Sequence, residues 1–110
     1  MKLPADAIID PRKATHYLLV WRAKGDKSAF LGRAGYTMAT ASRLVADLRA
    51  QILPHEAIPL ESTGHGQYYE IRAPLTGPNG RTLRIRAIWM TEHLSGITKF
   101  ITLVPDKTRR

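Results

Sequence analysis

Four polar side chains in this sequence have the chemistry needed to cleave a phosphodiester bond without a metal ion. His65 lies between two glycines in a tight connection, where an exposed imidazole titrates near neutral pH and can carry a proton. Lys27 and Arg86 supply positive charge that can stabilise a phosphorane, and Thr102 can orient a phosphate or a base. In RNA the 2′-hydroxyl attacks the adjacent phosphate, so this set of residues indicates RNA cleavage rather than DNA cleavage.

Each of these residues also has a purely structural explanation. A histidine between two glycines can be an ordinary turn residue, and an arginine on a strand can simply be solvated. Lys27 can be a surface lysine in the first turn of a helix, and Thr102 can be present because threonine favours strands. The sequence alone leaves both interpretations open.

Other kinds of catalytic site are excluded by composition and spacing. The chain has no cysteine, which removes disulfides, thiolate metal sites and cysteine nucleophiles. The glycine-rich phosphate loops and the signatures of zinc proteases, serine hydrolases and calcium-binding loops are also absent. The histidines are far apart and have no carboxylate at ligand spacing, at His16, His55, His65 and His93. We expect neither a metal ion nor a cofactor.

Three helices are predicted in the first half of the chain. The first begins at Asp10-Pro11, where a capping residue precedes a proline, and the second follows Asp26 and ends at Gly35. The third begins after Thr37 and ends before Pro54. Apolar residues recur along it at intervals of three and four, while Ser42, Arg43 and Asp47 lie off this stripe; its members are Met38, Ala41, Leu44, Val45, Leu48 and Ile52.

In the second half of the chain, apolar and polar residues alternate with a period of two, and β-branched and aromatic residues lie between turn clusters. Four strands are predicted, near residues 57 to 62, 67 to 73, 81 to 91 and 97 to 104. Their short connections favour an antiparallel meander, and Pro59 places the first strand at an edge. The predicted fold class is therefore α+β, with the N-terminal helices packed on one face of a four-stranded antiparallel meander sheet.

The alternation in the third strand predicts which face of the sheet the helices cover. Leu83, Ile85, Ala87 and Trp89 form the core set. The other face, which we call the open face, is predicted to be basic and aromatic, and it carries Tyr68, Arg72, Arg84, Arg86, Phe100 and Thr102. On this face the arginines would contact phosphates, and Tyr68 and Phe100 would stack on unpaired bases. Cross-strand packing is the alternative role for the two aromatic residues.

Chain length and net charge further limit the classes of function that the protein can have. The 110 residues form one domain, with helices over about 11–53, the sheet over about 57–104 and a short basic C-terminal tail. Seventeen Lys and Arg against nine Asp and Glu give a net charge of +8, which attracts RNA or an acidic protein, although a basic surface can also serve solubility alone. No secretory signal or membrane span is present in the sequence, so we expect a cytoplasmic protein that does not contact membranes.

A series of short motifs runs through nearly the whole chain in a fixed order. It comprises Leu3-Pro4, Tyr17-Leu18-Leu19, Lys27-Ser28-Ala29-Phe30, Ala34-Gly35-Tyr36, Gly66-Gln67-Tyr68-Tyr69, Ala73-Pro74-Leu75, Pro78-Asn79-Gly80-Arg81, Ile85-Arg86-Ala87-Ile88-Trp89 and Ile101-Thr102-Leu103-Val104-Pro105. In this order the chain resembles a small uncharacterised bacterial family, a domain of unknown function. The order of helices and meander, together with the closing motif, also looks like the barnase–EndoU–colicin–RelE group of ribonuclease toxins.

This resemblance implies a site of polar residues on a four-stranded sheet. Lys27, Arg86 and Thr102 match positions that would be polar site residues, and His65 lies in the matching hairpin. The sequence departs from the family pattern at three positions. Val104 stands where the closing motif has tyrosine, Tyr68 replaces a basic residue and Arg72 replaces an acidic one.

Together these observations predict a toxin-like, metal-independent endoribonuclease of a toxin–antitoxin or polymorphic-toxin system. Its partners would be RNA and an acidic antitoxin or immunity protein. Two alternatives remain open from the sequence. One is a non-enzymatic module that binds nucleic acid or an acidic protein through the same face, and the other is an accessory protein of a phage or mobile element.

Overall fold

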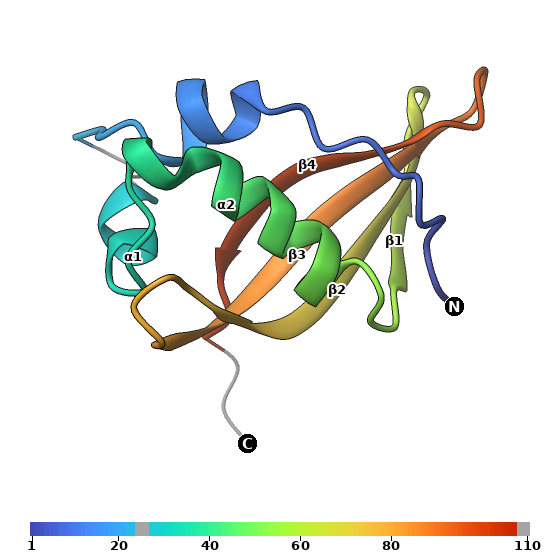
Figure 1. The fold of residues 1–110 in the computed structure, drawn as a ribbon. Helices are drawn as coiled ribbons and strands as arrows, with labels where there is room; N and C mark the ends of the chain where they lie inside the picture. The colour runs from blue at the N-terminus through green and yellow to red at the C-terminus, as the bar shows by residue number, and fades with distance from the viewer. Residues whose placement is uncertain (24–26, 108–110) are drawn as a thin grey trace.

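The computed structural model describes residues 1–23 and 27–107, and it has short helices followed by one antiparallel sheet (Figure 1). The helical elements are η1 (Ala14–Leu18), α1 (Ser28–Gly32), η2 (Met38–Thr40), α2 (Ala41–Asp47) and η3 (Leu48–Ile52). The strands are β1 (Ile58–Ser62), β2 (Gly66–Thr76), β3 (Thr82–Glu92) and β4 (Thr98–Pro105). The α+β fold class and the antiparallel sheet are confirmed.

The strands are hydrogen-bonded in chain order, β1-β2-β3-β4, so β1 lies at an edge as Pro59 predicts. The second strand runs beyond its predicted end at residue 73 to Thr76, because Leu75 is fully buried and pairs with Leu83. Pro74 is tolerated inside this strand because the pairing of β1 with β2 extends only as far as Glu70. Past that point one side of β2 needs no backbone donor.

The long helical segment formed by η2, α2 and η3 crosses one face of the sheet (Figure 1). The predicted apolar stripe is buried at Ala41, Leu44, Leu48 and Ile52. Met38 was expected on this stripe but is 49% exposed. It lies in a 3₁₀ turn, whose three residues per turn shift side chains away from the face that an α-helix would present.

The core set predicted on β3 is confirmed, because Ile85, Ala87 and Trp89 are fully buried and Leu83 nearly so. Phe100 was expected on the open face, but it is only 2% exposed and lies in the core. Its ring meets that of Trp89 edge-on, with the two ring centroids 5.2 Å apart.

A β-bulge explains this correction. Ile88 pairs with Thr102 and the next residue, Trp89, pairs with Phe100, so Ile101 is an extra residue in β4. One extra residue in a strand moves the side chains beyond it to the opposite face of the sheet from the one that simple alternation predicts. Phe100 and Thr98 consequently lie on the core side, whereas Thr102 stays on the open side.

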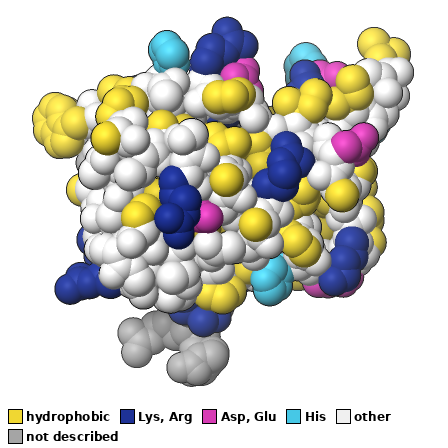
Figure 2. Space-filling view, viewed as in Figure 1, with side chains coloured by type: hydrophobic (Ala, Val, Ile, Leu, Met, Phe, Trp, Pro, Cys, Tyr) yellow, Lys and Arg dark blue, Asp and Glu magenta, His cyan; other side chains and the backbone are white. Residues whose placement is uncertain are grey.

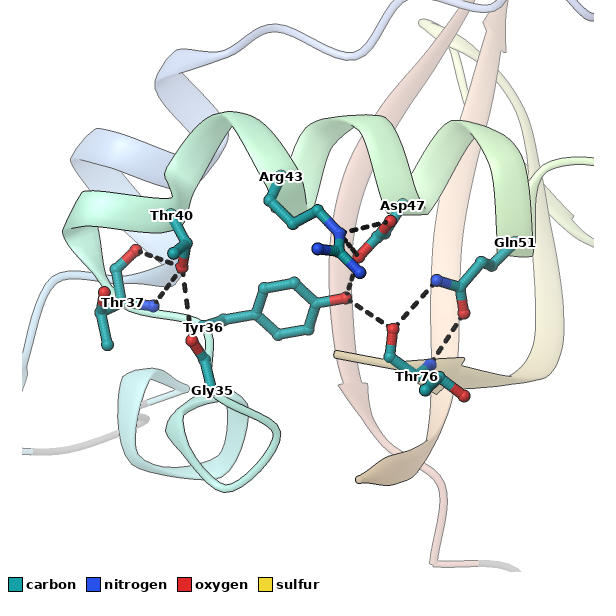
Figure 3. A network of polar contacts seen from close by, with 8 residues as sticks. All are labelled: Gly35, Tyr36, Thr37, Thr40, Arg43, Asp47, Gln51 and Thr76. Atoms are coloured by element: carbon teal, nitrogen blue, oxygen red, sulfur yellow. Dashed lines mark hydrogen bonds and ion pairs between the residues drawn. The ribbon is translucent and has the colours of Figure 1, made fainter. Parts of the chain in front are cut away.

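A buried polar network joins the helical layer to the sheet (Figure 3). Asp47 was predicted to lie off the apolar stripe, yet it is only 8% exposed. Its carboxylate accepts hydrogen bonds from the Tyr36 hydroxyl at 2.6 Å and from Arg43 Nε at 3.0 Å, and buried charges need such partners. The Tyr36 hydroxyl also lies 3.3 Å from the Thr76 carbonyl oxygen, and the Gln51 side chain bonds both backbone polar groups of Thr76.

Turn residues behave largely as predicted. Asp10 Oδ1 accepts the Arg12 backbone N–H at 3.0 Å at the start of the first helix, and Gly35 ends the second helical region with φ +92°. Asp26, the predicted cap of that region, lies outside the described residues. Gly77 packs against residue 34, where a Cβ would overlap the Ala34 carbonyl oxygen. In residues 1–23 and 27–107 no helix has the length and apolar character required to traverse a bilayer.

The two tryptophans give a matched test of this core. Trp89→Ala removes a fully buried ring and should lower the free energy of unfolding by about 3 to 5 kcal/mol. Trp21 is 73% exposed, so Trp21→Ala should change that free energy by less than about 0.5 kcal/mol. Urea unfolding followed by circular dichroism measures both values, and equal effects of the two substitutions would contradict the assigned core face.

Candidate functional site

The register of the sheet brings two polar clusters together on the open face. Glu70 on β2 pairs with Ile88 on β3, and Ile88 pairs with Thr102 on β4. We call these three residues the site row. Directly opposite residues of neighbouring strands project from the same face, so Glu70 and Thr102 flank an apolar floor formed by Ile88.

The first cluster surrounds the carboxylate of Glu70. Arg72 Nε donates to Glu70 Oε2 at 3.0 Å, and Arg86 Nε donates to Glu70 Oε1. Arg72 also bonds Asp106 at 2.9 Å, so the cluster reaches the end of β4. Burial alone would raise the pKa of Glu70, but the hydrogen bonds from Arg86 and Arg72 outweigh it and hold the pKa below its usual value. Glu70 is therefore an ionised carboxylate at neutral pH.

The second cluster centres on the Tyr17 hydroxyl, which comes from the N-terminal helix η1. It lies 3.1 Å from Thr102 Oγ1 and accepts a hydrogen bond from Lys27 Nζ at 3.2 Å. The hydrogen bond with Thr102 lowers the pKa of Tyr17, and Lys27 lowers it further, against the opposing effect of burial. Tyr17 is thus a more acidic proton donor than an ordinary tyrosine.

Positive charge also surrounds the ring of Tyr17. Lys27 Nζ lies 5.2 Å from the ring centroid, the guanidinium carbon of Arg22 lies 5.4 Å from it and Lys13 Nζ lies 5.8 Å from it. Cations at these distances are attracted to the face of an aromatic ring. They also give this edge of the site a positive potential that favours the approach of a phosphate.

The two clusters are close enough to act on one small group. Neighbouring strands lie about 4.8 Å apart, so the backbone at Glu70 and that at Thr102 are about 10 Å apart across the row. Arg86 pairs with Val104 and is therefore a diagonal neighbour of Thr102 on the same face. A phosphodiester placed over Ile88 would have a carboxylate on one side and a phenol on the other, with Arg86 and Lys27 beside it.

His65 lies apart from both clusters. It is exposed in the connection before β2, where its backbone N–H bonds Thr63 Oγ1 at 3.1 Å, and it lines a cavity of about 300 Å³ with Tyr68 and Glu92. Gly66 pairs with Glu92, four residues along β3 from the partner of Thr102, a distance of about 13 Å along the strand. The structure therefore brings Lys27, Arg86 and Thr102 into one region and leaves His65 outside it.

The remaining predicted contact residues have different environments. Arg72 is held by Glu70 and Asp106, and Arg84 is exposed near α1. Tyr68 is half-buried beside His65. The prediction that Phe100 stacks on bases is wrong, because the bulge in β4 puts its ring in the core.

Glu70 and Tyr17 were not identified as site residues from the sequence. For Glu70 a signal was available, because Arg72 and Arg86 come directly opposite each other when the hairpin is paired. Like charges opposite one another destabilise a sheet unless a carboxylate lies beside them. For Tyr17 no local signal exists, since its partner Thr102 is 85 residues away in the chain.

The described residues contain neither a metal site nor, on the face drawn in Figure 2, a continuous basic patch. Residues 1–23 and 27–107 contain no cluster of three His, Cys, Asp or Glu side chains that could hold a metal ion. On the face formed by the helices, Lys and Arg side chains are scattered and several adjoin acidic side chains (Figure 2). That view contains no continuous basic patch.

Comparison with known proteins identifies a family. A family model described as a domain of unknown function, DUF6883, matches residues 2–107, and the chain belongs to that family. No match is found among curated proteins or among solved structures.

The acidity of Tyr17 can be measured directly. Ultraviolet titration of the tyrosines should show an early ionisation step that Tyr17→Phe removes, because the pKa of Tyr17 is lowered. Thr102→Val should move that step to higher pH, since it removes the hydrogen bond that lowers the pKa most. Tyr69→Phe is the control and should leave the early step in place. An early step that survives Tyr17→Phe would contradict this assignment.

Proposed function

We propose that this member of the DUF6883 family is a metal-independent endoribonuclease whose reaction takes place over the site row. The observation that carries the proposal is the placement of Glu70 and of the Tyr17–Thr102 pair on opposite sides of Ile88. The carboxylate of Glu70 can accept a proton, and the phenol of Tyr17, whose pKa is lowered, can donate one. The arginine hydrogen bonds that lower the pKa of Glu70 make it a weaker base than a free carboxylate. General acid–base catalysis of transesterification needs such a pair.

The proposed reaction balances as a single displacement at phosphorus. The RNA 2′-oxygen forms a bond to phosphorus while its proton passes to Glu70. The bond from phosphorus to the 5′-oxygen breaks, and that oxygen takes the proton of the Tyr17 hydroxyl. The products are a 2′,3′-cyclic phosphate and a 5′-hydroxyl. The protonated Glu70 and the ionised Tyr17 then return to their starting states by exchange with water.

Positive charge near the phosphorane supports the same proposal. Arg86 uses Nε to hold Glu70, and its guanidinium has further N–H groups that can contact a phosphate oxygen. Lys27 would stabilise the ionised form of Tyr17 from 3.2 Å. Preorganised donors of this kind are commonly the largest contribution to catalysis of phosphate chemistry.

The same proposal includes a biological setting. A ribonuclease that cleaved cellular RNA without restraint would harm its own cell, and the net charge of +8 suits an acidic antitoxin or immunity protein that would restrain it. Such a partner would compete with RNA for the cations around Tyr17 and Arg86. The protein would then act as the toxin of a toxin–antitoxin or polymorphic-toxin system.

The decisive assay is incubation of the purified protein with RNA in EDTA, followed by analysis of the new ends. We expect 2′,3′-cyclic phosphate ends without added metal. Glu70→Gln and Tyr17→Phe should each lower the rate by about 10² to 10⁴, the usual contribution of one proton-transfer group. His65→Ala should leave the rate near that of the wild-type protein, because His65 lies outside the site row.

Glu61→Gln is the matched control, since it neutralises an exposed carboxylate on β1. Circular dichroism of each variant separates lost activity from lost folding. Intact RNA at high concentrations of the folded wild-type protein would overturn the enzyme proposal and favour a binding module. Cleavage that depends on His65 but not on Glu70 would move the reaction to the hairpin.

A further inference from the structure

A second cavity of about 560 Å³ lies outside the site row, where α1 adjoins the beginning of β3 and the end of β4. Figure 1 shows the end of β4 beside α1. Phe30 and Arg33 line the cavity from α1 and the residue after it, while Arg84 and Lys107 line it from the sheet side. The cavity thus combines one aromatic side chain and three cations with one carboxylate, that of Asp106, which is already held by Arg72.

The cations of this cavity differ from the arginines beside the site row. Arg72 and Arg86 are held by Glu70, whereas Arg33 and Arg84 make no ion pair with any residue in 1–23 or 27–107. The guanidinium carbon of Arg33 lies 5.8 Å from the centroid of the Phe30 ring. Unpaired cations that converge on a cavity attract an anionic ligand, and the half-buried ring adds a surface for a flat, apolar group.

A nucleotide has both features that this lining would recognise. We propose that the cavity binds one nucleotide of single-stranded RNA, with its base against Phe30 and its phosphate between Arg33 and Arg84. The volume lies within the roughly 300 to 1,000 Å³ typical of small-ligand sites. Base stacking on an aromatic side chain combined with cations along the backbone is the usual way proteins hold single strands.

The cavity also lies close to the site row, because β3 contributes to both. Arg84 and Arg86 are two residues apart on β3, so their side chains leave the same face about 6.6 Å apart. Asp106 lines the cavity and pairs with Arg72, which in turn bonds Glu70. A single-stranded RNA lying over Arg86 can therefore extend to Arg84. That this nucleotide adjoins the cleaved phosphate rests on the proposed function, whereas the binding itself does not.

Binding can be tested without any cleavage. The probes are inorganic phosphate, ribose 5-phosphate and the four nucleoside 5′-monophosphates, titrated into the ¹⁵N-labelled protein by NMR. At least one mononucleotide should bind about 5-fold to 150-fold more tightly than ribose 5-phosphate, the gain expected from stacking one base. Its shift changes should centre on Phe30 and Arg84. Equal affinities for that mononucleotide and for ribose 5-phosphate would overturn the proposal and leave only an anion site.

Substitutions locate the ligand. Arg84→Ala should weaken mononucleotide binding by about 10-fold, while Arg81→Ala, which removes one exposed charge near the start of the same strand but outside the cavity, should have little effect. Phe30→Leu keeps apolar bulk and should remove the preference for a mononucleotide over ribose 5-phosphate. Equal effects of Arg84→Ala and Arg81→Ala would overturn the proposal even if Phe30→Leu did not fold.

The outcome is separable from the proposed reaction. Glu70→Gln should lower the cleavage rate by about 10² to 10⁴ and keep the mononucleotide affinity. If the wild-type protein binds mononucleotides but leaves RNA intact, the nucleotide-binding proposal is supported and the ribonuclease proposal is wrong. If the wild-type protein cleaves RNA but binds no mononucleotide, and Arg84→Ala does not change the cleavage rate, the nucleotide-binding proposal is wrong and the ribonuclease proposal stands.

Discussion

One extra residue in β4 determines how both faces of the sheet are used. Without the bulge at Ile101, strict alternation would place Phe100 and Thr102 on the same face. The core would then lose the ring that contacts Trp89, or the open face would lose the hydroxyl that contacts Tyr17. The bulge allows an apolar core and a polar site to share one short edge strand.

A second constraint is electrostatic. Arg72 and Arg86 are directly opposite on neighbouring strands, and the carboxylate of Glu70 makes that arrangement tolerable. The same carboxylate keeps both guanidinium groups at fixed positions over the sheet. The open face therefore carries two guanidinium groups in fixed positions, whereas Arg84 makes no ion pair with any residue in the described part of the chain.

Most of the fold could be predicted because the spacing of apolar residues reflects which side chains of each helix or strand face the core. Alternation in β3 identified the core face, since each side chain is either in contact with the helices or not. Phe100 was misplaced because a bulge depends on one residue among several apolar ones and has no distinct composition. Asp47 was misplaced because its burial depends on Tyr36, eleven positions earlier, and on Arg43. The Tyr17 contact depends on tertiary folding and has no local pattern.

The Tyr17–Thr102 contact also bears on protein synthesis. The two residues are 85 positions apart, and a ribosome that adds about 5 to 20 residues per second needs about 4 to 17 s to make the chain between them. Until β4 has emerged and paired with β3, the hydroxyl of Tyr17 has no Thr102 beside it. A nascent chain therefore carries an incomplete candidate site while it is closest to ribosomal and messenger RNA.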